Sequence, residues 1–237
     1  MEYAVGRGFI KAHEAHKLTQ VLPGHAVTHF ASIKKDELLG ALLLAIDKIN
    51  SPVPRAALLV TAYCFPRVGE LLASTWSEID FNGALWTIPA EHTKRNRELL
   101  VPLPHQIVNL LHELKGYLQS CLYTKVDISK KRVFPAQRPT SGRTGDVAIT
   151  EGAMLMLLRR INRRNPYIPR VTIHGFRHTA STLLHEHGEN TLWVEAQMAH
   201  LDPNKVRQTY NSAEYLDERR GMMQRYADFL DSLKSKK

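Results

Sequence analysis

Apolar side chains recur at helical spacing over most of the chain. The clearest example follows Ser32, a residue type that favours the N-cap position, and carries one apolar face through Leu38, Leu42 and Ile46. A second, mostly apolar stretch opens at Ser51-Pro52 and is predicted to be a buried helix. The pattern predicts helices over 32–46, 53–64, 107–118, 150–162, 175–187, 192–200, from 203 onward and over 214–233.

Between two of these helices the hydrophobic period changes to that of strands. Residues 79–81 and 85–88 flank Asn82-Gly83, a strong short-range hairpin signal, and residues 99–101 predict a third strand. We therefore expect an α+β fold: a mainly helical domain with a small three-stranded antiparallel sheet.

Length and composition restrict the class of protein. The 237 residues, 43% of them hydrophobic, suit one large domain with its own core. No apolar run approaches the ~20 residues of a membrane span, and the first residues lack a signal-peptide pattern. Two cysteines without metal-type spacing indicate a reduced, cytosolic protein. Residues 1–30 are poorly patterned and are expected to be a linker or the remnant of an upstream domain, leaving 31–237 as one domain.

Positive charge is concentrated in one segment. Residues 125–170 contain 11 basic and three acidic residues, which gives +8 of the chain's net +9. Such a concentration favours a polyanionic partner, nucleic acid before an anionic membrane. A solvated basic surface that serves solubility explains the charge equally well.

Several polar residues are candidates for chemistry, although each has an ordinary structural explanation. Arg67 and Glu70 could be an intrahelical ion pair, a lysine at a hairpin tip is usually solvated, and a tyrosine on an amphipathic helix is more often core. Their order along the chain is more informative. The blocks are Cys64-Phe65-Pro66-Arg67-Val68-Gly69-Glu70, His92-Thr93-Lys94, His174-Gly175-Phe176-Arg177-His178-Thr179, Met198-Ala199-His200 and Thr209-Tyr210-Asn211.

This ordered set resembles the tyrosine recombinase family, most closely its phage-type integrases from prophages and genomic islands. The similarity extends over residues 32–233 and includes flanking runs such as 76–80, 86–90 and 133–135. It implies a catalytic domain of the DNA breaking-rejoining type.

The resemblance also implies roles for individual residues. Arg67 and Arg177 would clamp the phosphate with paired hydrogen bonds, and His200 would donate a further one. Glu70 would hold Arg67 in position. Neither a metal nor a cofactor is implied, because the two guanidinium groups supply the positive charge.

Three further residues would handle the nucleophile and the leaving group. By resemblance, Tyr210 attacks the phosphate and forms a 3′-phosphotyrosyl link, and Lys94 protonates the departing 5′-oxygen. His174 would assist proton movement at the nucleophile. Tyr215 and Tyr226 are alternative nucleophiles.

The implied partner is double-stranded DNA at attachment sites. The protein is expected to be a tetramer on synapsed DNA and a monomer when it is free of DNA, in the cytoplasm of a bacterial host. An accessory factor that bends DNA or sets direction is a further candidate partner, and no membrane contact is expected. The candidate DNA-binding residues are Lys130, Lys131, Arg132, Arg138, Arg143, Arg163 and Arg164.

Two other functions compete with integration and excision of a mobile element: a non-catalytic DNA-binding module and a type IB topoisomerase. Phe65 and Val68 depart from the residues usual in the family, which bears on the conformation of that loop. The resemblance implies that an arm-type and a core-binding DNA-binding domain usually precede this catalytic domain. Residues 1–30 are expected to be a linker or a short remnant of such an upstream DNA-binding domain.

Overall fold

The computed structural model describes residues 7–9, 33, 35–94, 96–122, 126–136, 146–199 and 215–235. The described helices are α3 (Asp36–Asp47), α4 (Pro52–Cys64), α5 (Val68–Ala73), α6 (His105–Cys121), α7 (Glu151–Arg164), α8 (Ile173–Glu186), α9 (Thr191–Gln197) and α11 (Leu216–Ser235), with short 3-10 turns η2 (Trp76–Glu78) and η3 (Ala90–His92). The strands are β1 (Ile79–Asp80), β2 (Leu85–Ile88) and β3 (Leu99–Pro102). Within these ranges no helix is long and apolar enough to cross a membrane.

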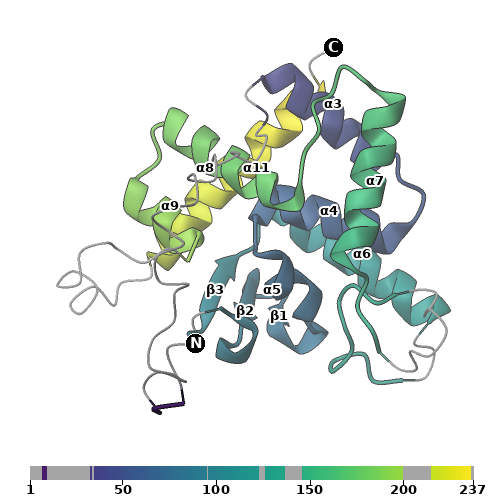
Figure 1. Cartoon of the computed structure of the whole chain (residues 1–237), viewed down its shortest axis with the longest axis vertical. Coiled ribbons are helices and arrows are strands. Elements are labelled where there is room, and N and C mark those ends of the chain that lie inside the picture. Colours follow the sequence, from purple (N-terminus) through teal and green to yellow (C-terminus); the bar gives the residue numbers. More distant parts are fainter. Residues whose placement is uncertain are drawn as a thin grey trace.

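Helix α4 forms the centre of the core. Residues 56–64 are all buried, which explains why the sequence there is apolar on every side. The helix packs against α3, α6, α7, α8 and α11. In Figure 1 the sheet and α5 lie below α4, with α8 and α9 on one side and α6 and α7 on the other.

The three strands form an antiparallel sheet in the order β1-β2-β3. This confirms the predicted α+β class, with one difference in the hairpin. Asp80 pairs with Leu85, so Phe81, predicted as the last residue of the first strand, instead belongs to a four-residue turn over 81–84. The cause is Asp80, whose carboxylate accepts the N–H groups of Asn82 and Gly83 at 3.0 Å each.

The C-terminal helix α11 packs on α3 of the same chain, where Gly40 allows the close approach. A Cβ atom at position 40 would lie 2.4 Å from the carbonyl oxygen of Leu233. On α11 the side chains of Met222, Met223 and Leu230 are buried. Helix α11 thus closes the core and also touches α9 and β3.

Two predicted helix ends are wrong. Helix α3 has Lys35 as its N-cap instead of Ser32, because Ile33 is buried and its N–H donates to Thr179 Oγ1 at 3.1 Å. The helix predicted over 192–200 ends at Gln197, because Ala199 takes a left-handed conformation with φ of 48°. The helix predicted from 203 lies outside the described residues.

Candidate active site

Arg67 is placed by the sharp turn between α4 and α5. Phe65 ends α4 in the left-handed region (φ 42°, ψ 44°), and Arg67 is the N-cap of α5. The backbone N–H of Arg67 donates to Glu70 Oε2 at 2.8 Å, and its Nη1 donates to Glu70 Oε1 at 2.7 Å. Because one carboxylate binds both the backbone and the side chain, it fixes the start of the helix together with the guanidinium.

Arg177 reaches the same place from the first turns of α8. That helix is capped by Thr172, whose Oγ1 accepts the N–H of Gly175 at 3.0 Å. The guanidinium is buried, with Nη1 donating to the carbonyl of Phe65 and Nη2 donating to the carbonyl of Met198 at 2.8 Å. Arg177 therefore ties the α4–α5 turn to the end of α9.

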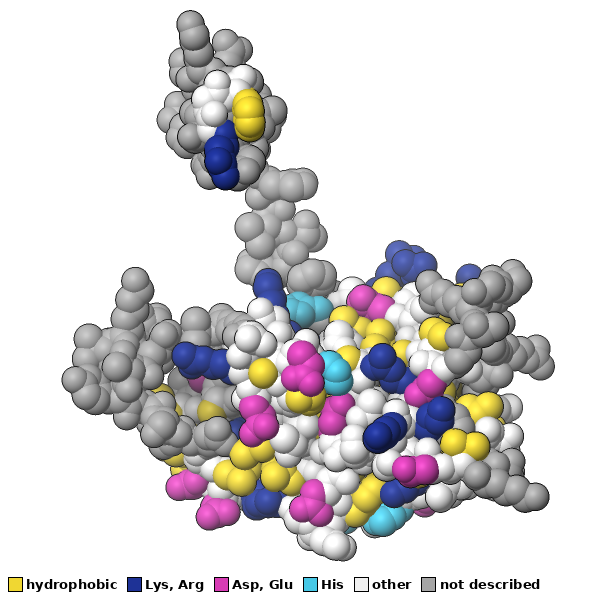
Figure 2. Space-filling model, turned by 90° about the horizontal axis from the view of Figure 1, so that it is seen from below, with side chains coloured by type: hydrophobic (Ala, Val, Ile, Leu, Met, Phe, Trp, Pro, Cys, Tyr) yellow, Lys and Arg dark blue, Asp and Glu magenta, His cyan; other side chains and the backbone are white. Residues whose placement is uncertain are grey.

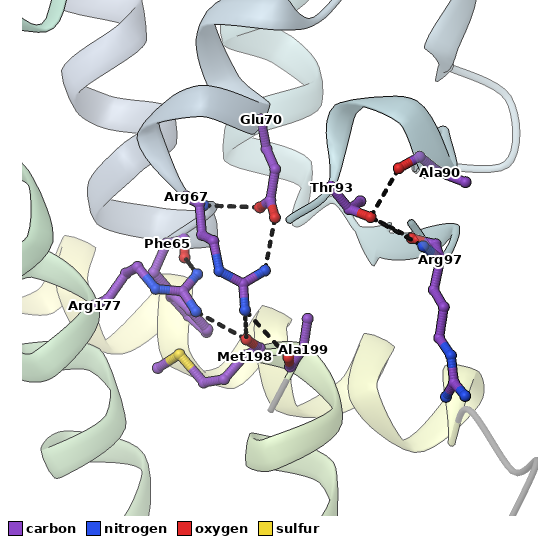
Figure 3. A network of polar contacts seen from close by, with 9 residues as sticks. All are labelled: Phe65, Arg67, Glu70, Ala90, Thr93, Arg97, Arg177, Met198 and Ala199. Carbon is purple, nitrogen blue, oxygen red and sulfur yellow. Dashed lines mark hydrogen bonds and ion pairs between the residues drawn. The ribbon is translucent and has the colours of Figure 1, made fainter. Parts of the chain in front are cut away.

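The carbonyl groups at the end of α9 bring the two arginines together. Arg67 Nη2 donates to the carbonyl of Ala199 at 3.1 Å and, more weakly, to that of Met198 at 3.5 Å. Met198 O thus accepts from both guanidinium groups, as the close view in Figure 3 shows. The left-handed backbone at Ala199 ends the helical conformation at this point, directly beside both carbonyls.

This arrangement concentrates positive charge in a partly buried place. The pKa of Arg177 is lowered to about 10: burial is the largest cause, the positive charge of Arg67 adds to it, and the negative charge of Glu70 opposes it. With a pKa near 10, Arg177 still carries its positive charge at neutral pH. Among the described residues no contact uses the Nε–H of either arginine, and the Arg67 side chain is 26% exposed. The pair can therefore bind an anion.

Of the other predicted site residues, two are exposed and two lie outside the described residues. Lys94 is exposed in the turn between β2 and β3, and His174 is exposed on the first turn of α8. Thr93 shapes the Lys94 turn, because its Oγ1 accepts the N–H of Arg97 at 3.1 Å (Figure 3). His200 and Tyr210 lie outside the described residues.

Of the two alternative tyrosines, Tyr226 is a core residue. Its ring packs edge-on against Phe65 at 5.7 Å, its hydroxyl donates to the carbonyl of Ala62 at 3.3 Å, and burial raises its pKa. A buried phenol with a raised pKa is poorly suited to attack DNA. Tyr215 is half-buried at the start of α11.

The candidate DNA-binding residues do not form one group. Lys130, Arg163 and Arg164 are exposed, the last two in the final turn of α7. Arg132 instead donates from its guanidinium to the carbonyl of Ala73. Lys131 is half-buried, and Arg138 and Arg143 lie outside the described residues. On the face in Figure 2, basic and acidic side chains of the described residues are interspersed.

Three contributors to this site have no role predicted from the sequence. The carbonyls of Met198 and Ala199 hold the arginines, but alanine does not favour a left-handed conformation, so no residue type indicates the turn. A buried arginine, Arg219 on α11, bonds to Gln197 at the end of α9. Its separation of 22 residues from Gln197 leaves no local pattern.

The mainly helical domain with a three-stranded sheet and a pair of converging arginines defines the class: the chain has the fold of a tyrosine recombinase catalytic domain. Solved structures share this fold. The integrase of mycobacterium phage Brujita has a TM-score of 0.57 at 14% identity and covers 98% of this chain and 72% of its own. The Tn1549 transposon integrase in complex with transposon right end DNA has a TM-score of 0.58 at 16% identity, covering 89% and 70%.

Sequence comparison gives the family. The model of the phage integrase family matches residues 33–216, and the chain belongs to that family. Prophage integrase IntS of Escherichia coli K12 and the integrase of Shigella phage Sf6 are each 30% identical over 97% of this chain and 55% of their own length. Prophage integrase IntZ of the same E. coli strain is 33% identical over 98% of this chain and 53% of its own. The chain spans about half the length of these curated relatives.

Proposed function

We propose that this chain cleaves and rejoins DNA strands at specific sites, through a covalent link between Tyr210 and a 3′-phosphate. The observation that carries the proposal is the convergence of Arg67 and Arg177 on one turn, supported by a buried carboxylate at 2.7 Å from Arg67. Membership of the phage integrase family supports it independently. The proposed biological role is integration and excision of a mobile element in a bacterial cell.

The arginine pair would act on the charge that develops during phosphoryl transfer. The transition state spreads negative charge over its equatorial oxygens, and fixed guanidinium donors stabilise it without reorganising. Because the shared carbonyls and Glu70 already hold both groups, little entropy is lost when the phosphate binds. We expect the phosphate to bind the remaining N–H groups of the two arginines, while the contacts to Met198 and Ala199 persist.

The cleavage step conserves the energy of the phosphodiester. The Tyr210 oxygen forms a bond to phosphorus while the bond from phosphorus to the 5′-oxygen breaks. The phenolic proton leaves with the help of His174, and Lys94 gives a proton to the 5′-oxygen. Rejoining reverses these transfers with the 5′-hydroxyl of the partner strand, while His200 donates to the phosphate throughout.

The exposed turn that carries Lys94 fits its role. Because this turn is exposed, it can bring Lys94 to the scissile phosphate when DNA binds. Arg177, in contrast, is buried and already held in position before DNA binds. A tetramer on synapsed sites, a free monomer and an accessory DNA-bending or directionality factor belong to this proposal. The proposal also takes residues 31–237 as the catalytic unit.

The experiment is covalent trapping. Nicked duplexes that tile the DNA flanking the gene are incubated with the chain in excess chelator, and adducts are separated on denaturing gels. We expect an adduct with wild-type protein and none with Tyr210→Phe, whose fold and DNA binding should survive. No adduct on any duplex, or adducts that need added magnesium, would overturn the proposal.

A further inference from the structure

Arg219 lies outside the site, but it connects helix α11 to two elements close to the site, α9 and β3. The residue is in the first turns of α11, and 2% of it is exposed, as is 2% of Gln197. Its Nε and Nη2 donate to Gln197 Oε1 at 3.1 and 2.7 Å. Nη2 also donates to the carbonyl of Leu100 in β3. In Figure 1, α11 passes beside both α9 and β3.

Gln197 connects this contact to the arginine pair. It is the last residue of α9, directly before the two carbonyls that accept from Arg67 and Arg177. The two donors of Arg219 also fix the orientation of the Gln197 amide, since its oxygen must face them. A shift of Gln197 would therefore move the turn that holds both guanidinium groups.

We propose that Arg219 is a positioning residue for the strand-cleavage reaction: by holding Gln197 it sets the Met198–Ala199 turn and, through it, the Arg67–Arg177 pair. The proposal rests on the proposed function. Helix α11 would then position the site in addition to closing the core.

The chemistry of the side chain agrees with this task. Burying a guanidinium costs free energy, and an apolar residue such as the neighbouring Met222 or Met223 would close the core at lower cost. A planar guanidinium can bond an amide oxygen and a strand carbonyl at once, in a fixed direction. A lysine ammonium at the same position is a point charge on a flexible stem and does not fix the amide in the same way.

The adjacent Arg220 provides a matched control. It lies on the same helix and also donates to sheet-side carbonyls, those of Gly83 at 2.7 Å and Ala84 at 3.4 Å, at the β1–β2 turn. It therefore anchors α11 to the sheet without touching α9 through any contact within the described residues.

The test measures the rate of adduct formation at saturating nicked duplex, using the duplex of highest yield with the wild-type chain, together with the Kd for the same DNA. We expect Arg219→Lys and Gln197→Leu to slow the reaction roughly 10- to 100-fold with an unchanged Kd. Gln197→Glu should stay near the wild-type rate, because a carboxylate oxygen still accepts both N–H groups. Arg220→Lys should react like the wild type.

Two further arms make the outcome decisive. The first arm uses circular dichroism at the assay temperature to measure the folded fraction, so that each rate refers to folded protein. If Arg219→Lys does not fold, the test rests on the comparison of Gln197→Leu with Gln197→Glu. The second arm uses DNA with sulfur at the bridging 5′ position, whose thiolate leaves without a proton. We expect this substrate to rescue Lys94→Ala but not the Arg219 and Gln197 variants.

Normal rates in Arg219→Lys and Gln197→Leu would overturn the positioning role. Rescue of these variants by the thio substrate would also overturn it, since Arg219 would then act through β3 and the Lys94 turn. Failure of the proposed function gives a different result, namely no adduct with the wild-type chain or an adduct that persists in Tyr210→Phe.

Discussion

Replacing Glu70 by glutamine tests whether the buried carboxylate holds the arginine pair. The change keeps the shape of the side chain but removes its charge. Glutamine can still accept from Arg67 Nη1, which now lies 2.7 Å from Glu70 Oε1. Its amide nitrogen would then face the backbone N–H of Arg67, where a carboxylate oxygen now accepts at 2.8 Å, so one bond becomes a contact between two donors.

The expected loss of stability is large for a single isosteric change. Glu70 is 1% exposed, and hydrogen bonds to charged groups contribute about 1.5–3 kcal/mol each. Removing one partner of a buried pair costs about 3–5 kcal/mol. Because glutamine retains one acceptor and Arg67 is 26% exposed, we expect about 2–3 kcal/mol.

A second Arg–Glu pair of equal length is the control. Arg225 binds Glu189 through two contacts of 2.7 Å, and here the Arg225 side chain is 58% exposed while that of Glu189 is 10% exposed. Because the exposed Arg225 guanidinium lets solvent screen the pair, we expect Glu189→Gln to cost about 1 kcal/mol, close to the value for surface pairs. If contact distance alone decided the loss, the two substitutions would lower the free energy of unfolding equally. Because burial of the pair also counts, we expect a larger loss for Glu70→Gln.

Urea unfolding followed by circular dichroism measures both variants. With an m-value of about 2 kcal/mol/M, Glu70→Gln should lower the midpoint by about 1 M and Glu189→Gln by no more than half as much. Glu70→Gln should also slow adduct formation, because Arg67 loses its anchor. Equal midpoints for the two variants would refute the reasoning that Glu70 stabilises the site by buried charge.

Three other predictions follow from the same geometry. Arg177→Ala should cost about 3 kcal/mol or more of transition-state stabilisation in single-turnover cleavage, and Arg177→Lys should not restore it, because an ammonium cannot bond two acceptors in the guanidinium geometry; a full-rate lysine variant would contradict this. Lys94→Ala should be almost inactive on ordinary DNA and active on the 5′-thio substrate, whereas Tyr210→Phe should be inactive on both; normal cleavage of ordinary DNA by Lys94→Ala would remove its assignment as the acid. DNA affinity should fall steeply with salt, and Arg163→Ala with Arg164→Ala should reduce the log–log slope by about 0.9 for each phosphate that these side chains neutralise; an affinity that is flat between low and moderate salt would exclude such neutralisation.

Much of the fold could be predicted because its elements carry local signals. The spacing of leucines after Pro104 predicts α6, Thr150 marks the start of α7 through its side-chain cap, and Ser51-Pro52 opens α4. The strand signals around Asn82-Gly83 predict the sheet, although Asp80 makes the turn longer. In each case the residues that decide the structure lie within a few positions of it.

The rest depends on contacts between distant segments. Ile33 is held by Thr179, which is 146 residues away, and this moves the start of α3. Similarly, the block containing Met198 and Ala199 predicts a role for His200, while the backbone carbonyls that hold the arginines have no sequence signature. The spacing of Arg219 from Met222 and Met223 places it on the buried face of α11, but its partner Gln197 lies 22 residues away and has no local signal.

The most direct test of the central claim is to map the covalent link. A nicked duplex is trapped on the wild-type chain, the adduct is digested with protease and nuclease, and the nucleotide-bearing peptide is identified by tandem mass spectrometry. We expect a 3′-phosphate joined to the oxygen of Tyr210. A nucleotide on Tyr215, on Tyr226 or on a residue other than tyrosine would contradict the proposed mechanism.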